Sequence, residues 1–194
     1  MRRVAVLVCV LMLGLAACGG GKRVGTMPSP RPSSPSPSSP SPSPSIAAQQ
    51  LRQYFAAILP AFASADRAGN VFRKGYKVFS AHGEAVSAYP AFQRAAEKAI
   101  GACTSAQVAL SAVTPPPGME KAHENLLKSW RQQYALAVFI RENLRLKKPY
   151  SNWWHGAETR SVAQEETYHL WLVAVKAEAK KLGVEIPAKL RAVM

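Results

Sequence analysis

From residue 46 onward, apolar residues recur along the chain at spacings of three and four. This spacing places apolar side chains on one face of an α-helix, whereas a half-buried strand alternates at every second residue. No alternating run of strand length is present. The pattern therefore predicts an all-α domain of about four main helices. Short connections between successive helices favour an antiparallel bundle.

The first predicted helix carries an apolar stripe formed by Leu51, Phe55, Ile58, Leu59 and Phe62. Pro60 predicts a kink in it, because proline lacks the backbone N–H that a helix interior uses. Gly69 and Asn70 predict its end. For residues 71–87 two alternatives stay open: a short helix that packs its aromatic side chains on the bundle, or a small hairpin around Gly75.

The second predicted helix begins near Pro90, which suits a first helical turn. Its apolar positions then follow an unbroken heptad spacing at Phe92, Ala96, Ala99, Cys103, Ala106, Leu110 and Val113. Most of these residues are small, so we expect a partner helix to approach closely or to fill the space with large side chains. We interpret Cys103 as a buried small hydrophobic residue.

The run Thr114–Gly118 contains three prolines and predicts a rigid corner before the third helix, which Pro149 closes. The last helix is predicted to start after Ser151 or Asn152, either of which suits an N-cap, and to end at Gly183. Its inner stripe comprises Trp154, Ala157, Ser161, Gln164, Tyr168, Trp171, Leu172, Val175, Ala179 and Leu182. The bulky residues expected against the alanine-rich seam are Trp130, Tyr134, Tyr168 and Trp171.

Residues 1–17 have the features of an export signal. Arg2 and Arg3 precede an apolar run from Val4 to Leu13. A helix needs about 20 apolar residues to span a bilayer, so this run is too short for a permanent anchor. A positive start, a short apolar core and small residues before a cleavage point predict a signal peptide.

The sequence Leu15-Ala16-Ala17-Cys18 resembles the lipobox of bacterial lipoproteins. The resemblance implies that a diacylglycerol is attached to the Cys18 thiol and that cleavage falls between Ala17 and Cys18. Two acyl chains hold a protein stably on a bilayer. We therefore expect the protein to be anchored in the membrane through Cys18, on the outer face of the cytoplasmic membrane in the cell envelope.

Residues 18–45 are predicted to form a disordered linker after the lipidated cysteine. From Pro28 to Ser45 the chain contains only proline, serine and Arg31, so it has no apolar side chain to bury. The prolines favour an extended path of ~3.1 Å per residue, which gives this tract a reach of roughly 55 Å. Residues 46–194 then have the size of one helical-bundle domain.

The predicted domain is basic. Residues 46–194 contain 20 basic and 11 acidic residues, a net charge of +9. Such a charge favours anionic partners, among them anionic lipid, wall polymer and acidic envelope proteins. We expect no nucleic-acid partner, because an exported and tethered protein rarely meets one.

Aromatic and basic residues gather near the predicted turn between the last two helices. They are Tyr150, Trp153, Trp154, His155, Arg145 and Lys148. One interpretation is a ligand-binding surface. The other is an aromatic plug over the end of the bundle, since Trp and Tyr often cover a core with their polar edges in water.

Two Glu-x-x-His pairs raise the alternative of a metal-binding bundle. Glu120 precedes His123, and Glu166 precedes His169, on two different predicted helices. Di-iron bundles use two such pairs together with a glutamate from each remaining helix. The other two helices offer no inward carboxylate, so the sequence favours no metal and no other cofactor.

Nothing in the sequence indicates catalysis. It contains no Gly-x-Ser-x-Gly, no phosphate-binding glycine loop and no paired carboxylates on an inner helix face. The triple-proline corner followed by a helix with His123 resembles uncharacterised helical-bundle lipoproteins of bacteria, over about residues 105–140, and this resemblance implies no activity. We therefore expect a non-enzymatic envelope lipoprotein whose domain binds or scaffolds. The alternatives are a metal- or small-ligand-binding bundle and a weak binder of anionic lipid or wall polymer.

Overall fold

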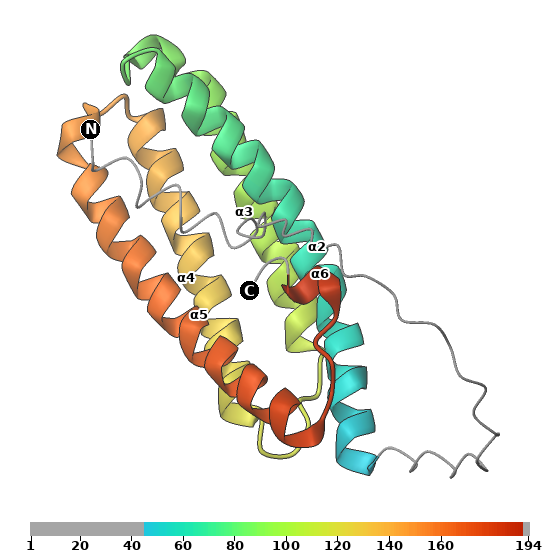
Figure 1. Ribbon diagram of the computed structural model, residues 1–194. Helices are drawn as coiled ribbons and strands as arrows, with labels where there is room; N and C mark the ends of the chain where they lie inside the picture. Colours follow the sequence, from blue (N-terminus) through green and yellow to red (C-terminus); the bar gives the residue numbers. More distant parts are fainter. Residues whose placement is uncertain (1–44, 192–194) are drawn as a thin grey trace, which may run out of the picture.

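The computed structural model describes residues 45–191, so the predicted signal peptide, the lipobox and most of the linker lie outside the described residues. The described chain is all-α (Figure 1). Its main helices are α2 (Ile46–Ala81), α3 (Tyr89–Ser111), α4 (Glu120–Arg145) and α5 (Trp154–Leu182). Three short helices complete it: η1 (Val86–Ala88), η2 (Tyr150–Asn152) and α6 (Ala188–Arg191). Each main helix packs antiparallel to the one before it, which confirms the predicted bundle.

The first helix is much longer than the sequence predicts. Helix α2 continues without interruption through Gly69 and Gly75, so both its predicted end and the hairpin alternative are wrong. The reason is packing beyond the glycines: Phe72, Tyr76 and Phe79 continue the apolar stripe and are buried. Burial of three aromatic side chains outweighs the helix propensity lost at glycine, which is about 1 kcal/mol per residue.

Helices α2 and α3 approach each other closely where small residues meet. A Cβ atom added at Gly75 would lie 2.5 Å from the Cβ of Ala95, a distance that real side chains do not adopt. On the same face of α3, Ala96 and Ala99 are also buried. The close approach is made at Ala95, one position beside the predicted seam, and Gly75 permits it from α2.

Large rings fill the bundle where α2 faces α4 and α5. Phe62 stacks on Trp171 with their ring centroids 5.3 Å apart, and it meets Trp130 edge-on at 6.0 Å. The ring of Tyr168 packs beside both Phe62 and Trp171. Three of the four predicted bulky residues are thus confirmed as core, and Cys103 is buried in the same cluster.

Tyr134 is the exception among the predicted bulky residues. Its side chain is 39% exposed, so the prediction that it fills the core is wrong. The nearby inner positions of α4 are taken by Leu136 and Ala137, which are buried. Tyr134 lies at the margin of the apolar face.

The end of the chain folds back on the bundle. Gly183 adopts the left-handed conformation with φ 60° and ends α5, as predicted. Leu190 of α6 is fully buried in the core beside α2 (Figure 1). The start of α5 differs from the prediction, because Ser151 and Asn152 belong to η2 and Trp153 precedes the helix without a side-chain cap.

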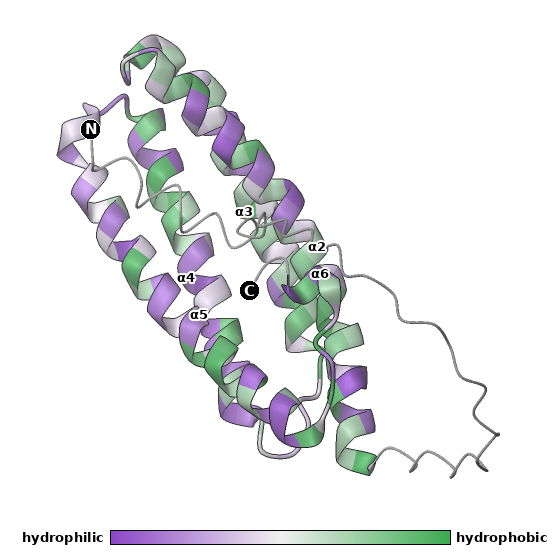
Figure 2. Cartoon of the chain, in the orientation of Figure 1, coloured by the Kyte–Doolittle hydropathy of each residue, from purple (hydrophilic) through white to green (hydrophobic). Residues whose placement is uncertain are grey.

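The core divides into two clusters along the length of the bundle. The proximal cluster, near the start of α2, includes Leu51, Ile58, Leu110, Leu126 and Val175. The distal cluster, near the other end, includes Phe72, Phe79, Phe92, Ile140 and Trp153. On α5, Ser161 and Gln164 fall between the two clusters, and both are buried with an oxygen that has no hydrogen-bond partner. Figure 2 shows polar and apolar positions interleaved along all four main helices.

We predict opposite effects for the same substitution at two helical glycines. Gly75→Ala should lower the free energy of unfolding by about 1–3 kcal/mol, because the new methyl group overlaps Ala95. Gly101→Ala should raise it by about 0.5–1 kcal/mol, because no atom lies near the added methyl group and alanine favours a helix. Urea titration followed by circular dichroism measures both. Equal effects at the two positions would contradict the close approach of α2 and α3.

Candidate functional site

The predicted aromatic and basic surface lies at the end of the bundle opposite Ile46, where α2 begins. Helix α2 contains 36 residues, so at ~1.5 Å per residue it carries the chain about 54 Å away from the linker. The turn between α2 and α3 and the turn between α4 and α5 both lie at this distal end (Figure 1). The distal end is therefore the part of the domain farthest along the bundle from where the linker joins.

The aromatic residues of this surface close the end of the core. The Tyr150 ring lies 5.1 Å from Trp153, 4.7 Å from Trp154 and 5.4 Å from Phe79, measured between ring centroids. Trp154 also stacks on Tyr76 at 6.0 Å. Trp153 is only 3% exposed. The structure thus brings the rings together as a plug and leaves the basic side chains around them at the surface.

Hydrogen bonds fix the turn that carries the lysines. The Lys148 carbonyl accepts from the Tyr89 hydroxyl at 2.7 Å and from the Trp153 indole N–H at 3.3 Å. The Lys148 N–H donates to the Asn143 carbonyl at 3.1 Å, and Lys147 takes a left-handed conformation with φ 50°. Both lysine side chains are exposed. The turn therefore presents two ammonium groups from a backbone that the aromatic plug holds in place.

Charge pairing differs among the cations of the distal end. Arg141 and Arg145 both bind Glu142, and their hydrogen bonds hold the pKa of that carboxyl below its ordinary value. His155, whose side chain is 92% exposed, lies 3.6 Å from Glu158. No carboxylate of the described residues pairs with Lys147 or Lys148. The same holds for the exposed Lys74, Lys77, Arg94 and Lys98, so what distinguishes Lys147 and Lys148 is the hydrogen-bonded turn that carries them.

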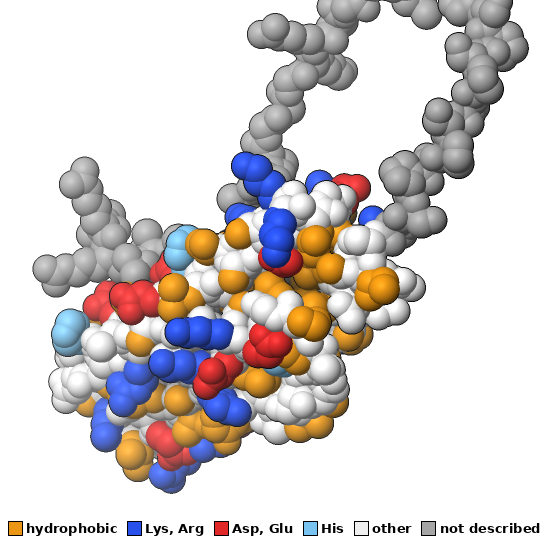
Figure 3. Space-filling view, turned by 90° about the horizontal axis from the view of Figure 1, so that it is seen from below, with side chains coloured by type: hydrophobic (Ala, Val, Ile, Leu, Met, Phe, Trp, Pro, Cys, Tyr) orange, Lys and Arg blue, Asp and Glu red, His pale blue; other side chains and the backbone are white. Residues whose placement is uncertain are grey.

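The positive charge of the domain is spread over both halves of the bundle. When each main helix is divided near its middle, the distal residues 66–98 and 132–168 contain eleven basic and seven acidic residues, a net charge of +4. The rest of residues 46–194 contributes nine basic and four acidic residues, a net charge of +5. Figure 3 shows the molecule from below, the proximal side of Figure 1, where basic and acidic side chains are interspersed. Net charge alone therefore does not distinguish the two halves, and the distal end differs by its aromatic plug and its fixed lysine turn.

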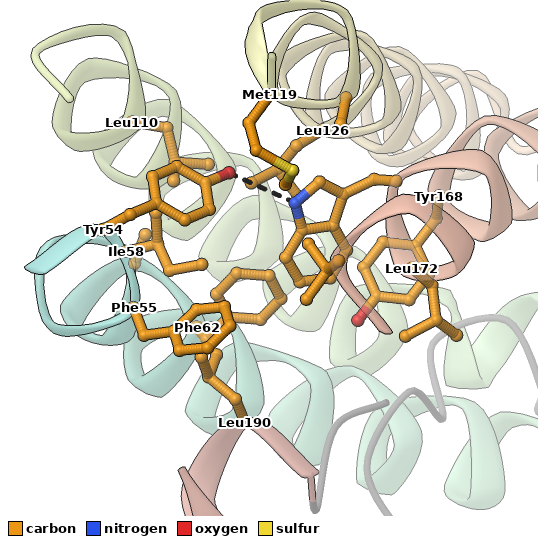
Figure 4. Close-up of a cluster of buried hydrophobic side chains, with 14 of the residues drawn as sticks. Tyr54, Phe55, Ile58, Phe62, Leu110, Met119, Leu126, Tyr168, Leu172 and Leu190 are labelled. Carbon is orange, nitrogen blue, oxygen red and sulfur yellow. Dashed lines mark hydrogen bonds between the residues drawn. The ribbon is translucent and has the colours of Figure 1, made fainter. Parts of the chain in front are cut away.

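A buried polar network lies near the proximal end. The Trp171 indole N–H donates to the Tyr54 hydroxyl oxygen at 3.2 Å (Figure 4). The hydroxyl in turn contacts His123 Nδ1 at 3.1 Å, and His123 Nε2 lies 3.1 Å from the Leu110 carbonyl. A carbonyl only accepts, so Nε2 carries the proton and Nδ1 accepts from Tyr54. Each nitrogen of the network then has one partner in the neutral state, and the Tyr54 hydroxyl has two, because it accepts from Trp171 and donates to His123.

Burial controls the protonation of this network. It lowers the pKa of His123 below its ordinary value of 6.5, although the hydrogen bond to the Leu110 carbonyl opposes the shift. It also raises the pKa of Tyr54 to about 12. The nearby Cys103 thiol behaves in the same way, with its pKa raised to about 12. These groups are neutral at physiological pH, so they serve the core and carry no reactive thiolate or phenolate.

The structure does not assemble the residues of the metal alternative. His123 is buried and uses both ring nitrogens in the network, whereas His169 is exposed on α5. Glu120 and Glu166 are exposed as well. Among residues 45–191, no three His, Cys, Asp or Glu side chains are grouped in a way that would hold a metal ion.

A groove of about 530 Å³ lies beside the network, between α2 and the triple-proline corner. Its lining comprises Gln50, Gln53, Tyr54, Ala57 and the segment Ala112–Pro117. This lining has two amide side chains and no charged group. The three prolines signalled a rigid corner in the sequence, but nothing there showed which helix the corner would face.

Comparisons of the chain with protein-family models, with curated proteins and with solved structures find no match. The resemblance to helical-bundle lipoproteins around the triple-proline corner therefore gains no support from them.

We predict that acidification destabilises the protein through His123. The pKa of His123 is lower in the folded than in the unfolded state, so the unfolded state binds the proton more readily. The contribution of neutral His123 to the free energy of unfolding is complete above about pH 6.5, and it decreases as the pH falls toward the folded-state pKa. The melting temperature should drop by a few degrees between about pH 7.5 and 5. In His123→Gln the melting temperature should fall less over this pH range than in the wild type. In His169→Asn, at an exposed position, it should fall as much as in the wild type.

Proposed function

We propose that this protein is a lipid-anchored cell-envelope protein whose helical domain binds or scaffolds a partner without catalysing a reaction. The lipobox residues Ala17 and Cys18, the preceding short apolar run and the Pro/Ser linker support the anchor. None of the helices in residues 45–191 is long and apolar enough to cross a membrane. In this proposal the lipid holds the protein, and the linker separates the domain from the bilayer.

The observation that carries the binding role is the fixed lysine turn at the distal end. Its backbone is ordered by Tyr89, Trp153 and Asn143 before any ligand arrives, so binding does not have to order it. Lys147 and Lys148 are exposed and project from the turn beside the aromatic plug. This arrangement supports an anionic partner, such as wall polymer or the head groups of anionic lipid.

A second candidate function is the binding of a small neutral ligand. The groove between α2 and the triple-proline corner supports it, because a volume of about 530 Å³ falls within the usual range of ligand sites. The amides of Gln50 and Gln53 can donate and accept hydrogen bonds, while Ala57 and the prolines offer apolar contact. A ligand there would be uncharged, in contrast to the partner of the distal end.

We predict that Cys18→Ser releases the protein from the membrane. Without the thiol no diacylglycerol can be attached, and the two acyl chains that give stable membrane attachment are lost. Cell fractionation of the wild type should place the protein with membranes, and the variant should be found in the soluble or secreted fraction. Cys103→Ser serves as the control, because this buried cysteine should not affect partitioning. A Cys18→Ser variant that still fractionates wholly with membranes would exclude the lipid anchor.

We also predict that the lysine turn supplies most of the affinity for anionic surfaces. With residues 18–194 carrying Cys18→Ser, Lys147→Gln together with Lys148→Gln should weaken binding to phosphatidylglycerol vesicles by roughly 30-fold, at about 1 kcal/mol per lysine. Binding should also weaken steeply as salt is raised from about 0.05 to about 0.5 M. Vesicle co-sedimentation measures both effects, with phosphatidylcholine vesicles as the neutral reference.

The matched control is Lys121→Gln together with Lys128→Gln, which removes the same charge from exposed positions of the proximal half. Its affinity should stay within about threefold of the wild type, because screening limits the reach of distant charges. Equal losses from the two pairs would mean that net charge alone drives binding and that the fixed turn has no special part.

A further inference from the structure

Helix α5 has apolar side chains on its outer face as well as on its inner face. The inner stripe packs against the rest of the bundle, but Val162, Leu170 and Val173 point outward with 43%, 57% and 51% of their surface exposed. A helix that packs on one side only normally carries polar residues on the other side. The outer face of α5 therefore departs from the pattern of a solvent-facing helix.

The charges of this face are segregated by sign. Glu165 and Glu166 precede the exposed Leu170 and Val173 along α5. Lys176 and Lys180 follow them. All four charged side chains are exposed. None of them forms an ion pair within the described residues, although Lys181 and Glu178 on the same helix do so at 3.2 Å.

The spacing places these groups in one line. Glu166, Val173 and Lys180 are each seven residues apart, and a step of seven returns nearly to the same side of an α-helix. An acidic residue, an apolar residue and a basic residue thus follow one another along the outer face, with the apolar residue midway between opposite charges. Such a line is complementary to itself when it is reversed.

We propose that the outer face of α5 binds the same face of a second copy of this chain, with the two helices antiparallel and a two-fold axis near Val173. Val173 then meets Val173 of the second copy, and Glu166 lies opposite Lys180. The symmetry generates the charge pair twice, as in any interface that uses one patch on both subunits. A parallel pair is disfavoured, because it would place Glu166 against Glu166.

The small size of the face sets the strength of this association. Three partly exposed aliphatic side chains bury less surface than a standard protein interface, which covers about 800 Å² per partner. The dimer is therefore weak, and the fraction of the chain that is dimeric rises with protein concentration. It depends on α5 alone and is independent of the lipid anchor and of the lysine turn.

A charge exchange tests the proposal. The measurement is sedimentation equilibrium of residues 18–194 with Cys18→Ser, which prevents dimers through that thiol. The mass of the wild type should rise toward that of a dimer with concentration. Glu166→Lys and Lys180→Glu should each weaken dimerisation about tenfold, because each places like charges opposite each other twice. The double variant restores both pairs and should recover the wild-type constant.

Substitutions at two exposed valines test whether the dimer uses this face or any exposed apolar side chain. Val173→Glu should abolish the dimer, since it sets two carboxylates against each other at the axis. Val108→Glu on α3, where the valine is 69% exposed, should leave the dimer unchanged. Circular dichroism checks that each variant remains helical. A chain that stays monomeric up to about 1 mM, single variants that dimerise like the wild type, or a double variant that fails to recover would each overturn the proposal.

Discussion

The bundle depends on how α2 meets its neighbours, with small residues against α3 at one level and large rings against α4 and α5 at another. Where α3 presents Ala95, the backbone of α2 comes close enough that only Gly75 fits. Farther along, Phe62 fills a wider space by stacking on Trp171 and meeting Trp130 edge-on. Helix α2 thus packs closely at one level and is joined to its neighbours through aromatic rings at another.

The periodicity of apolar residues predicted those parts of the fold in which local sequence preference and tertiary packing favour the same structure. The α3 seam, the inner stripe of α5 and the turn at Gly183 all followed from the sequence. The prediction failed where a local signal opposed a distant contact. Gly69 and Asn70 read as a helix end, but aromatic packing beyond them keeps α2 intact. The spacing of Tyr134 predicts a core position, but spacing does not show where the margin of an apolar face lies, and Leu136 and Ala137 take the inner positions instead.

The candidate site shows the same limit. Its residues were visible in the sequence, since Tyr150, Trp153 and Lys148 lie close together along the chain. What holds them was not visible: the Lys148 carbonyl is bound by Tyr89, which lies 59 residues away in sequence. The partner of His123 is Tyr54, at a separation of 69 residues. Residue types suggest a chemistry, but contacts over such separations decide whether a histidine is a ligand or a part of the core.

The placement of the two ends has a mechanical consequence. The described chain begins at Ser45, where the predicted linker would join, and the lysine turn lies at the other end of the bundle (Figure 1). A pull between an anchored linker and a captured partner would run parallel to the helix axes. Such a load acts in shear, so the stacked rings of the core resist together instead of separating one after another. An attachment at the same end would peel the helices apart. The antiparallel order that makes the fold compact therefore also suits it to bear tension.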